Sequence, residues 1–291
     1  MKEIGMALLG AALIFFWAGK SWAEKPLEKA ILIVAFGTSV EKARVAYATV
    51  EQQVKEAFPD HRVEWAWSAR TLLGTTPARM PSTQQALAKL GADGTEDVLV
   101  FSLHVIPGRE YHDLIQTVKA FEGLPKGLKE IRLGPPLLHD TDSLKAAAAI
   151  LVKNAATARK PGEALLLAGH GTHHPAGIYY PALQYYLSAL DRNAFVGTIE
   201  GEPDFEEARA AMKSAGVKKV WLAPLMTVAG DHSRNDLFGP EAESWKRRLE
   251  ADGFTVECVD RGLGEDRELI SLWIKGLKDA AAPEKIRKVS P

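Results

Sequence analysis

The sequence predicts an α/β protein with two similar lobes, each a parallel sheet flanked by helices, and a cleft between the lobes. Apolar, β-rich runs alternate with amphipathic helical stretches along most of the 291 residues. The second half then repeats the series of strands and helices found in the first. This alternation favours parallel sheets, because a connection between parallel strands needs a long crossover that is usually a helix.

The first half predicts four strands with helices between them. The run AILIVAFG at 30–37 is almost continuously apolar, as expected of a strand buried on both faces. Ser39 is a candidate cap for the helix that follows. The remaining expected strands are 61–69, 97–105 and 129–138, and the expected helices are 41–58, a helix around 81–91, and 112–123.

The second half predicts the same order of elements. The helix at 203–216 starts with acidic residues and ends at a Gly, which is typical of a capped helix. The stretch 139–162 contains a helix that we expect to cross between the lobes. The expected strands are 163–169, 194–201, 218–228 and 254–264, and the other expected helices are 178–192, 240–253 and one that closes the chain.

Short motifs recur between the halves and predict where the lobes meet. AFGTS (35–39) matches GHGTH (169–173), and LHVIPG (103–108) matches LMTVAG (225–230). All four motifs follow expected strands, and ligands of open parallel sheets bind beyond the carboxyl ends of the strands. We therefore expect these loops to face one cleft between a lobe at 24–140 and a lobe at 141–291.

The N-terminal residues 1–23 resemble a secretory signal peptide. Lys2 precedes an uncharged apolar run, and the run ends at a Ser-Trp-Ala site before a charged segment. We expect cleavage after Ala23 and a periplasmic protein. An uncleaved membrane anchor is the alternative, but the run is short for a span. No later segment could cross a bilayer, so we expect no stable membrane association after cleavage.

Composition excludes some classes of partner and scaffold. The 36 basic and 37 acidic residues nearly balance, which argues against nucleic acid as a partner. The single Cys258 excludes an internal disulfide and is expected to be a small buried residue in a strand. The tyrosine-rich stretch 179–187 is expected to be helix core, with an interface in a homo-oligomer as the alternative.

Three strand-end loops of the second half carry possible metal ligands: His170 in LAGHGTHH, Glu200 in GTIEGEPD and His232 in TVAGDHSRND. Each residue alone is more commonly an ordinary loop residue, but their shared position suggests that they converge. Two imidazoles and one carboxylate suit Co, Ni, Fe or Zn. Nearby glycines allow sharp turns and close approach to a ligand.

Other residues are candidates for binding a ligand beside the metal. His104 lies late in a strand and is expected to face the cleft, with a hydrogen-bonded core histidine as the alternative. His112 lies near the start of a helix as a candidate accessory ligand of a metal or of haem iron. His173 and His174 share the turn of His170 and are expected to edge the cleft. Arginine forks match carboxylates, and the candidate arginines are Arg70, Arg109 and Arg234.

The sequence lacks the motifs of several other classes of enzyme and binding site. AFGTS has neither the spacing nor the Lys of a phosphate-binding P-loop, and neither Ser39 nor Ser233 lies in a GxSxG elbow. A metal-dependent hydrolase is disfavoured because no bridging carboxylate cluster is evident.

The chain resembles the anaerobic cobalt chelatases of the sirohydrochlorin type, within the class II chelatases that include ferrochelatases. The resemblance rests on ILIVAFGTS, SLHVIPGREYHDL, LLLAGHGTHHPA, TIEGEPD, APLMTVAGDHSRNDLFG and a late GLGE, which follow the family order. It implies two flavodoxin-like lobes, insertion of Co²⁺, with Fe²⁺ as a further candidate, into sirohydrochlorin, and metal binding by His170, Glu200 and His232. The alternative is an exported carrier of metal, haem or another tetrapyrrole that performs no turnover.

Overall fold

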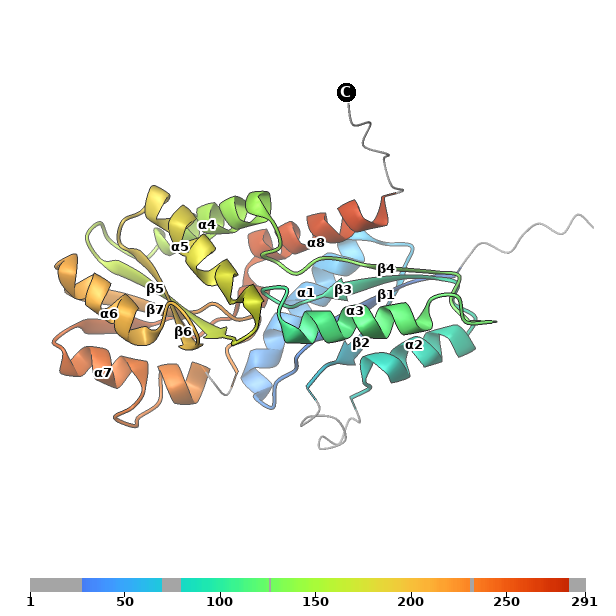
Figure 1. Ribbon diagram of the computed structural model, residues 1–291, viewed down its shortest axis with the longest axis horizontal. Coiled ribbons are helices and arrows are strands. Elements are labelled where there is room, and N and C mark those ends of the chain that lie inside the picture. Colours follow the sequence, from blue (N-terminus) through green and yellow to red (C-terminus); the bar gives the residue numbers. More distant parts are fainter. Residues whose placement is uncertain (1–27, 70–79, 126, 231–232, 283–291) are drawn as a thin grey trace, which may run out of the picture.

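The computed structural model describes residues 28–69, 80–125, 127–230 and 233–282, which form two lobes of the same design (Figure 1). Each lobe contains a four-stranded parallel sheet, with strand orders β2-β1-β3-β4 and β6-β5-β7-β8. The two orders are equivalent, so the internal repeat expected from the motifs is confirmed. The predicted α/β class is confirmed as well.

The N-terminal lobe has one layer of helices on each face of its sheet. Helices α1 and α8 cover one face, and α2 and α3 cover the other. Its strands are β1 (Lys29–Ala35), β2 (Arg62–Trp67), β3 (Asp97–Ser102) and β4 (Glu130–Leu133). Its helical segments are a 3₁₀ turn (Glu41–Arg44), α1 (Val45–Ala57), α2 (Thr83–Ala92) and α3 (Arg109–Phe121).

The C-terminal lobe repeats this arrangement with α4 and α5 on one face and α6 and α7 on the other. Its strands are β5 (Ala164–Gly171), β6 (Ala194–Glu200), β7 (Lys219–Pro224) and β8 (Thr255–Cys258). Its helices are α5 (Tyr179–Leu190), α6 (Phe205–Ser214) and α7 (Trp245–Ala251), with short turns at Pro175–Ile178, Ser233–Leu237 and Leu263–Glu265.

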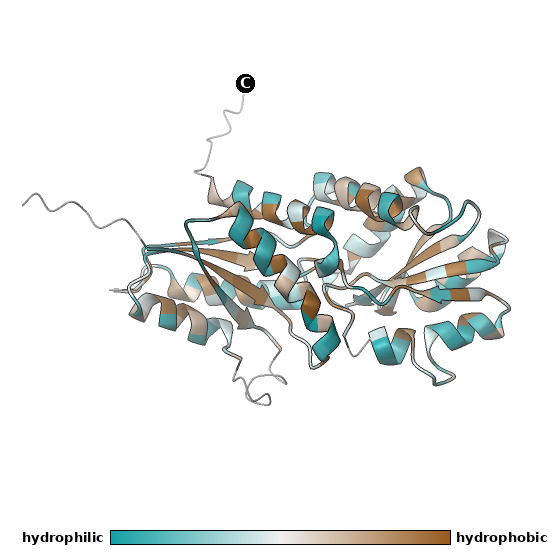
Figure 2. Ribbon diagram, turned by 180° about the vertical axis from the view of Figure 1, so that it is seen from behind, coloured by the Kyte–Doolittle hydropathy of each residue, from teal (hydrophilic) through white to brown (hydrophobic). Residues whose placement is uncertain are grey.

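The strands supply the centre of both cores (Figure 2). In β1, Ile31 and Ile33 face the layer of α1 and α8, whereas Leu32 and Val34 face the layer of α2 and α3. All four side chains are fully buried. This explains the continuous apolar run, because successive strand residues point to opposite faces and both faces are covered.

The last helix of each half crosses to the other lobe. Helix α4 (Thr141–Ala155) follows β4 but packs against α5 of the C-terminal lobe. Helix α8 (Arg267–Ala281) follows β8 but packs against α1, β3 and β4 of the N-terminal lobe (Figure 1). The predicted boundary between residues 140 and 141 therefore falls between the two sheets, and the N-terminal sheet takes one helix, α8, from across that boundary.

Local details differ from the sequence predictions at several places, and the strands predicted at 129–138 and 254–264 are shorter, Glu130–Leu133 and Thr255–Cys258. Val40, not Ser39, is the residue before the first helical turn, and the Val40 side chain makes no capping hydrogen bond. Helix α7 is shorter than predicted because Ser244 caps it by accepting a hydrogen bond from Arg247 N–H. Cys258 is exposed rather than buried, because it ends the edge strand β8. Among the described residues, no helix is long and apolar enough to cross a membrane.

Candidate active site

A cavity of about 560 Å³ lies between the lobes at the carboxyl ends of their strands. Its walls come from the four repeated motifs and the turn before α3, as expected from their positions after strands. Ligands in parallel sheets bind at these strand ends, near the point where the strand order reverses. The lining residues include Phe36, Thr38, Tyr47, His104, Arg109, Glu110, Tyr111, His170, Thr172, Tyr180, Glu200 and Met226.

His170 and Glu200 lie at the ends of the adjacent strands β5 and β6. Gly171 pairs with Glu200 in the register of the two strands. Gly171 has φ of 82°, and a Cβ at this position would lie 1.7 Å from the Glu200 carbonyl oxygen. Only glycine allows this backbone contact, which holds the two candidate ligands on neighbouring strand ends. The His170 Nδ1 lies 3.3 Å from the Gly171 carbonyl oxygen.

Tyr180 of α5 supports this strand end from behind. Its hydroxyl accepts a hydrogen bond of 3.2 Å from the Gly171 N–H. Its ring occupies the space beside Gly169, where a Cβ would lie 2.4 Å from the ring. The side chain is almost fully buried, and burial raises the pKa of its hydroxyl. The tyrosine spacing predicts a position in the helix core, but the contact of Tyr180 with the candidate ligand loop could not be predicted from it.

His104 lines the N-terminal side of the cavity, as predicted. Its Nδ1 lies 2.8 Å from the Ser102 hydroxyl, and its Nε2 is buried without a hydrogen-bond partner in the described part of the chain. Burial lowers the pKa of His104 to about 4, so the imidazole is neutral near pH 7. It adds a neutral nitrogen base to the cavity wall.

A hydrogen bond joins the two lobes at the repeated motifs. The Thr227 hydroxyl donates to the carbonyl oxygen of Leu103 at 2.7 Å. Leu103 and Leu225 occupy the same position in the two copies of the motif, and both are buried. At the cavity, this hydrogen bond therefore connects the segment after a strand of one sheet to the segment after a strand of the other.

Four other candidates, His112, Arg234, His232 and Arg70, lie outside the cavity or outside the described residues. His112 is exposed on α3, and its ring meets the ring of His174 edge-on with centroids 4.7 Å apart. Arg234 is exposed and lies 4.0 Å from Asp260, and it does not line the cavity. His232 and Arg70 lie outside the described residues, so the convergence of His232 with the other two ligands stays a prediction.

The described residues alone contain no group of three His, Cys, Asp or Glu side chains arranged to hold a metal ion. They do bring together His170, Glu200, His104 and Arg109 in one cavity. Tyr47 and Tyr111, which were not predicted from the sequence, also line this cavity. Burial raises the pKa of both phenols, so both are protonated near pH 7.

Comparisons with known proteins agree with this architecture. A profile of the family described as "Cobalt chelatase (CbiK)" matches residues 29–282. The sirohydrochlorin cobaltochelatase CbiKC of Nitratidesulfovibrio vulgaris is 34% identical over 258 residues, which cover 88% of this chain and 91% of that protein. The sirohydrochlorin cobaltochelatase of Salmonella typhimurium is 31% identical over 262 residues, or 87% and 97% of the two chains.

Solved structures show the same fold at low sequence identity. SirB from Bacillus subtilis, solved with Fe³⁺, superposes with a TM-score of 0.60 at 14% identity and covers 88% of this chain and 96% of its own. CbiX, described as the terminal enzyme of sirohaem biosynthesis in denitrifying bacteria, has a TM-score of 0.54 at 18% identity, with coverages of 87% and 100%. The two-lobed fold expected from the family resemblance is confirmed.

Proposed function

The chain belongs to the cobalt chelatase (CbiK) family and is a metal chelatase, and on that premise we propose that it inserts Co²⁺ into sirohydrochlorin in the cavity between its lobes. The arrangement of His170 and Glu200 on adjacent strand ends carries the proposal, because it places an imidazole and a carboxylate in one cavity. Both named relatives are sirohydrochlorin cobaltochelatases.

In the proposed reaction His170, Glu200 and His232 bind the incoming metal. An open set of two imidazoles and a carboxylate suits a divalent ion that has to be released again, because a closed site would retain it. The carboxylate offsets part of the positive charge during transfer. Fe²⁺ suits the same ligands, and we propose it as a second metal substrate.

Metal insertion releases two pyrrole protons for each Co²⁺ that enters. A neutral imidazole accepts a proton near neutral pH, and we assign this role to His170. His104 lines the same cavity, and we propose that it contacts the tetrapyrrole there. Arg109, exposed at the same cavity, binds a substrate carboxylate through its guanidinium group. A cleft between two lobes can also hold the ring in a bent form that exposes the nitrogen lone pairs.

The test is an anaerobic assay with sirohydrochlorin and Co²⁺, followed by absorption against a protein-free control. We expect repeated turnover by the wild type and loss of turnover in His170→Ala. His173→Ala is the matched control, because His173 is an exposed imidazole of the same loop that does not line the cavity. A single stoichiometric spectral shift without turnover would instead support the carrier alternative.

The cellular site and haem binding are separate proposals. We propose that the protein is periplasmic, on the strength of the signal-like sequence at 1–23, and fractionation of cells that express the full chain tests this. We propose His112 as an accessory ligand of haem iron because its imidazole is exposed. A haem titration followed at the Soret band, with His112→Ala beside the wild type, tests that role. Loss of the spectral change in the variant is the expected result.

A further inference from the structure

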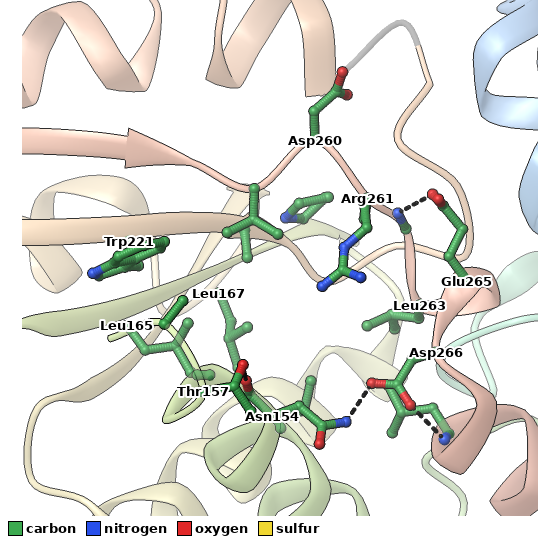
Figure 3. Close-up of a pocket in the computed structure, with 18 of the residues that line it drawn as sticks. Asn154, Thr157, Leu165, Leu167, Trp221, Asp260, Arg261, Leu263, Glu265 and Asp266 are labelled. Atoms are coloured by element: carbon green, nitrogen blue, oxygen red, sulfur yellow. Dashed lines mark hydrogen bonds between the residues drawn. The ribbon is translucent and has the colours of Figure 1, made fainter. Parts of the chain in front are cut away.

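A second cavity, of about 710 Å³, lies on one face of the C-terminal sheet (Figure 3). Helix α4 forms one side, β5 and β7 form the floor, and the segment 258–269 that leads into α8 forms the other side. It shares no lining residue with the cavity between the lobes. Its volume lies within the range of about 300–1,000 Å³ that is typical of sites for small molecules.

This cavity exists because the exchanged helices cover the two sheets unequally. In the N-terminal lobe, α8 packs against β3 and β4, and all six residues of β3 are buried. The equivalent strand β7 is buried at only every second position, and Trp221 and Ala223 stay half-buried on the face toward α4. Helix α4 packs instead against α5 and α8. The gap that remains over β7 is the second cavity.

The floor of the cavity is apolar and most of the charged groups around it are paired. Figure 3 shows Leu165 and Leu167 of β5 and, on the side of the segment 258–269, Leu263. Ala223 of β7 also lines the floor. Three of the charged side chains form ion pairs: Asp260 with Lys42 at 2.7 Å, Glu268 with Lys153 at 2.5 Å, and Arg267 with Glu56 at 3.1 Å. Asp266 accepts a hydrogen bond of 2.6 Å from the side-chain amide of Asn154.

Arg261 is the exception. Its guanidinium group makes no hydrogen bond or ion pair within the described part of the chain, and Figure 3 shows it directed into the cavity between Leu167 and Leu263. The guanidinium group presents a rigid fork of donors that binds a carboxylate or sulfonate through two parallel hydrogen bonds. A cation directed over an apolar floor is complementary to an anion that carries an apolar body.

We propose that this second cavity binds a small organic anion, with its carboxylate or sulfonate on Arg261 and its apolar body on Leu165, Leu167 and Ala223. The site is independent of the chelatase reaction, because the two cavities have separate walls. Its ligand belongs to a chemical class different from a metal ion, and its head group is smaller than the polycarboxylate rim of a tetrapyrrole.

The first test titrates the purified full chain with 1-anilinonaphthalene-8-sulfonate, a flat apolar body with one sulfonate, and follows its fluorescence. Because a charge-assisted pair is lost, Arg261→Gln is expected to weaken binding at this site by about 10-fold or more. Arg192→Gln is the matched control, because Arg192 is also exposed but does not line the cavity. We expect its affinity to equal that of the wild type.

The second readout locates the probe. Cys258 is the only cysteine of the chain, is exposed, and lines this cavity. Bound probe should therefore slow alkylation of Cys258 by iodoacetamide at constant pH, and Arg261→Gln should remove that protection at the same probe concentration. The cavity between the lobes contains no cysteine, so probe bound there leaves the alkylation rate unchanged.

Two outcomes would overturn the proposal. Probe binding that is equal in wild type and Arg261→Gln, with no protection of Cys258, would place the probe elsewhere. Alkylation that slows as the protein concentration rises, without any probe, would show that a second copy of the chain covers this face. Circular dichroism and the melting temperature of Arg261→Gln verify that the variant is folded, which we expect because Arg261 is exposed.

Discussion

Replacing Gly171 by Ala tests whether the contact between β5 and β6 positions the metal ligands. The added Cβ would lie 1.7 Å from the Glu200 carbonyl oxygen, whereas real Cβ atoms stay beyond 3.0 Å from their neighbours. The strand ends must therefore separate by more than about 1 Å. His170 precedes this position and Glu200 is the contacted residue, so the two candidate ligands move apart.

Two separate costs follow from this substitution. The left-handed backbone at φ of 82° costs an alanine about 1–2 kcal/mol. The forced separation adds to that cost by weakening the end of the strand pair. A displacement of about 1 Å in a catalytic constellation lowers activity by roughly 100-fold. We therefore expect Gly171→Ala to lose about 100-fold in cobalt insertion and to melt several degrees below the wild type.

Gly162→Ala is the control that separates these costs. Gly162 has nearly the same φ, 88°, but a Cβ there meets nothing within 4 Å. The Gly162→Ala substitution should therefore carry only the backbone cost of about 1–2 kcal/mol. This lowers the melting temperature by about 2–8 °C, because 1 kcal/mol corresponds to about 2–4 °C in a chain of this size. Its chelatase rate should stay at the wild-type level. If Gly171→Ala matched Gly162→Ala in both rate and melting temperature, the positioning argument would be refuted.

The structure makes three further predictions. Tyr180→Phe leaves the Gly171 N–H without an acceptor and should cost about 1–2 kcal/mol, measured by urea unfolding. The folded pKa of His104, about 4, lies below its ordinary value of 6.5, so its contribution to stability is full above pH 6.5 and is lost, by up to about 3 kcal/mol, as the pH falls toward 4. NMR titration of the ring should find it neutral at pH 5, and a midpoint near 6.5 would contradict the assigned burial. Hydrogen bonding to Arg209 lowers the pKa of Asp252, so its stabilising effect is present above about pH 4 and is lost below it. Asp252→Asn should therefore lower the urea midpoint at pH 7, and its difference from the wild type should shrink progressively as the pH falls below about 4.

The strands and the cavity between the lobes could be predicted because each depends on local pattern. The continuous apolar run of β1 indicates burial on two faces, and the recurrence of AFGTS and GHGTH indicates equivalent strand ends. From these patterns alone, His170, Glu200 and His104 could be placed near one another. The structure confirms that they line the same cavity.

Contacts between distant segments could not be predicted in the same way. Nothing in the local sequence of α8 indicates that it covers β3 and β4 rather than β7. The apolar face of an amphipathic helix does not specify which sheet it packs against. The contact of Tyr180 with Gly171 was missed for the same reason, since tyrosines at helical spacing usually indicate core. The sequence did contain one indication of this contact. Glycines such as Gly169 in GHG leave room for a neighbouring side chain to pack against the backbone, and the Tyr180 ring occupies that room.

The edge position of β8 explains the error at Cys258. An apolar run that ends a sheet resembles a central strand in sequence, because both contain Val and aromatic residues. Only the strand order shows that β8 has one neighbour, β7, and so exposes its far side. The burial of a residue in a short strand depends on the place of that strand in the sheet.

The exchange of α4 and α8 has a consequence for any attempt to divide the gene. A fragment that ends at residue 140 retains its whole sheet but lacks the helix whose Leu277 and Trp273 fill its core. The complementary fragment carries that helix with no sheet to cover. Each half is therefore expected to aggregate when produced alone, and the two halves produced in the same cell are expected to reassemble into one particle. The chain therefore resembles a dimer in which two subunits exchange a helix, except that the two subunits are joined in one chain.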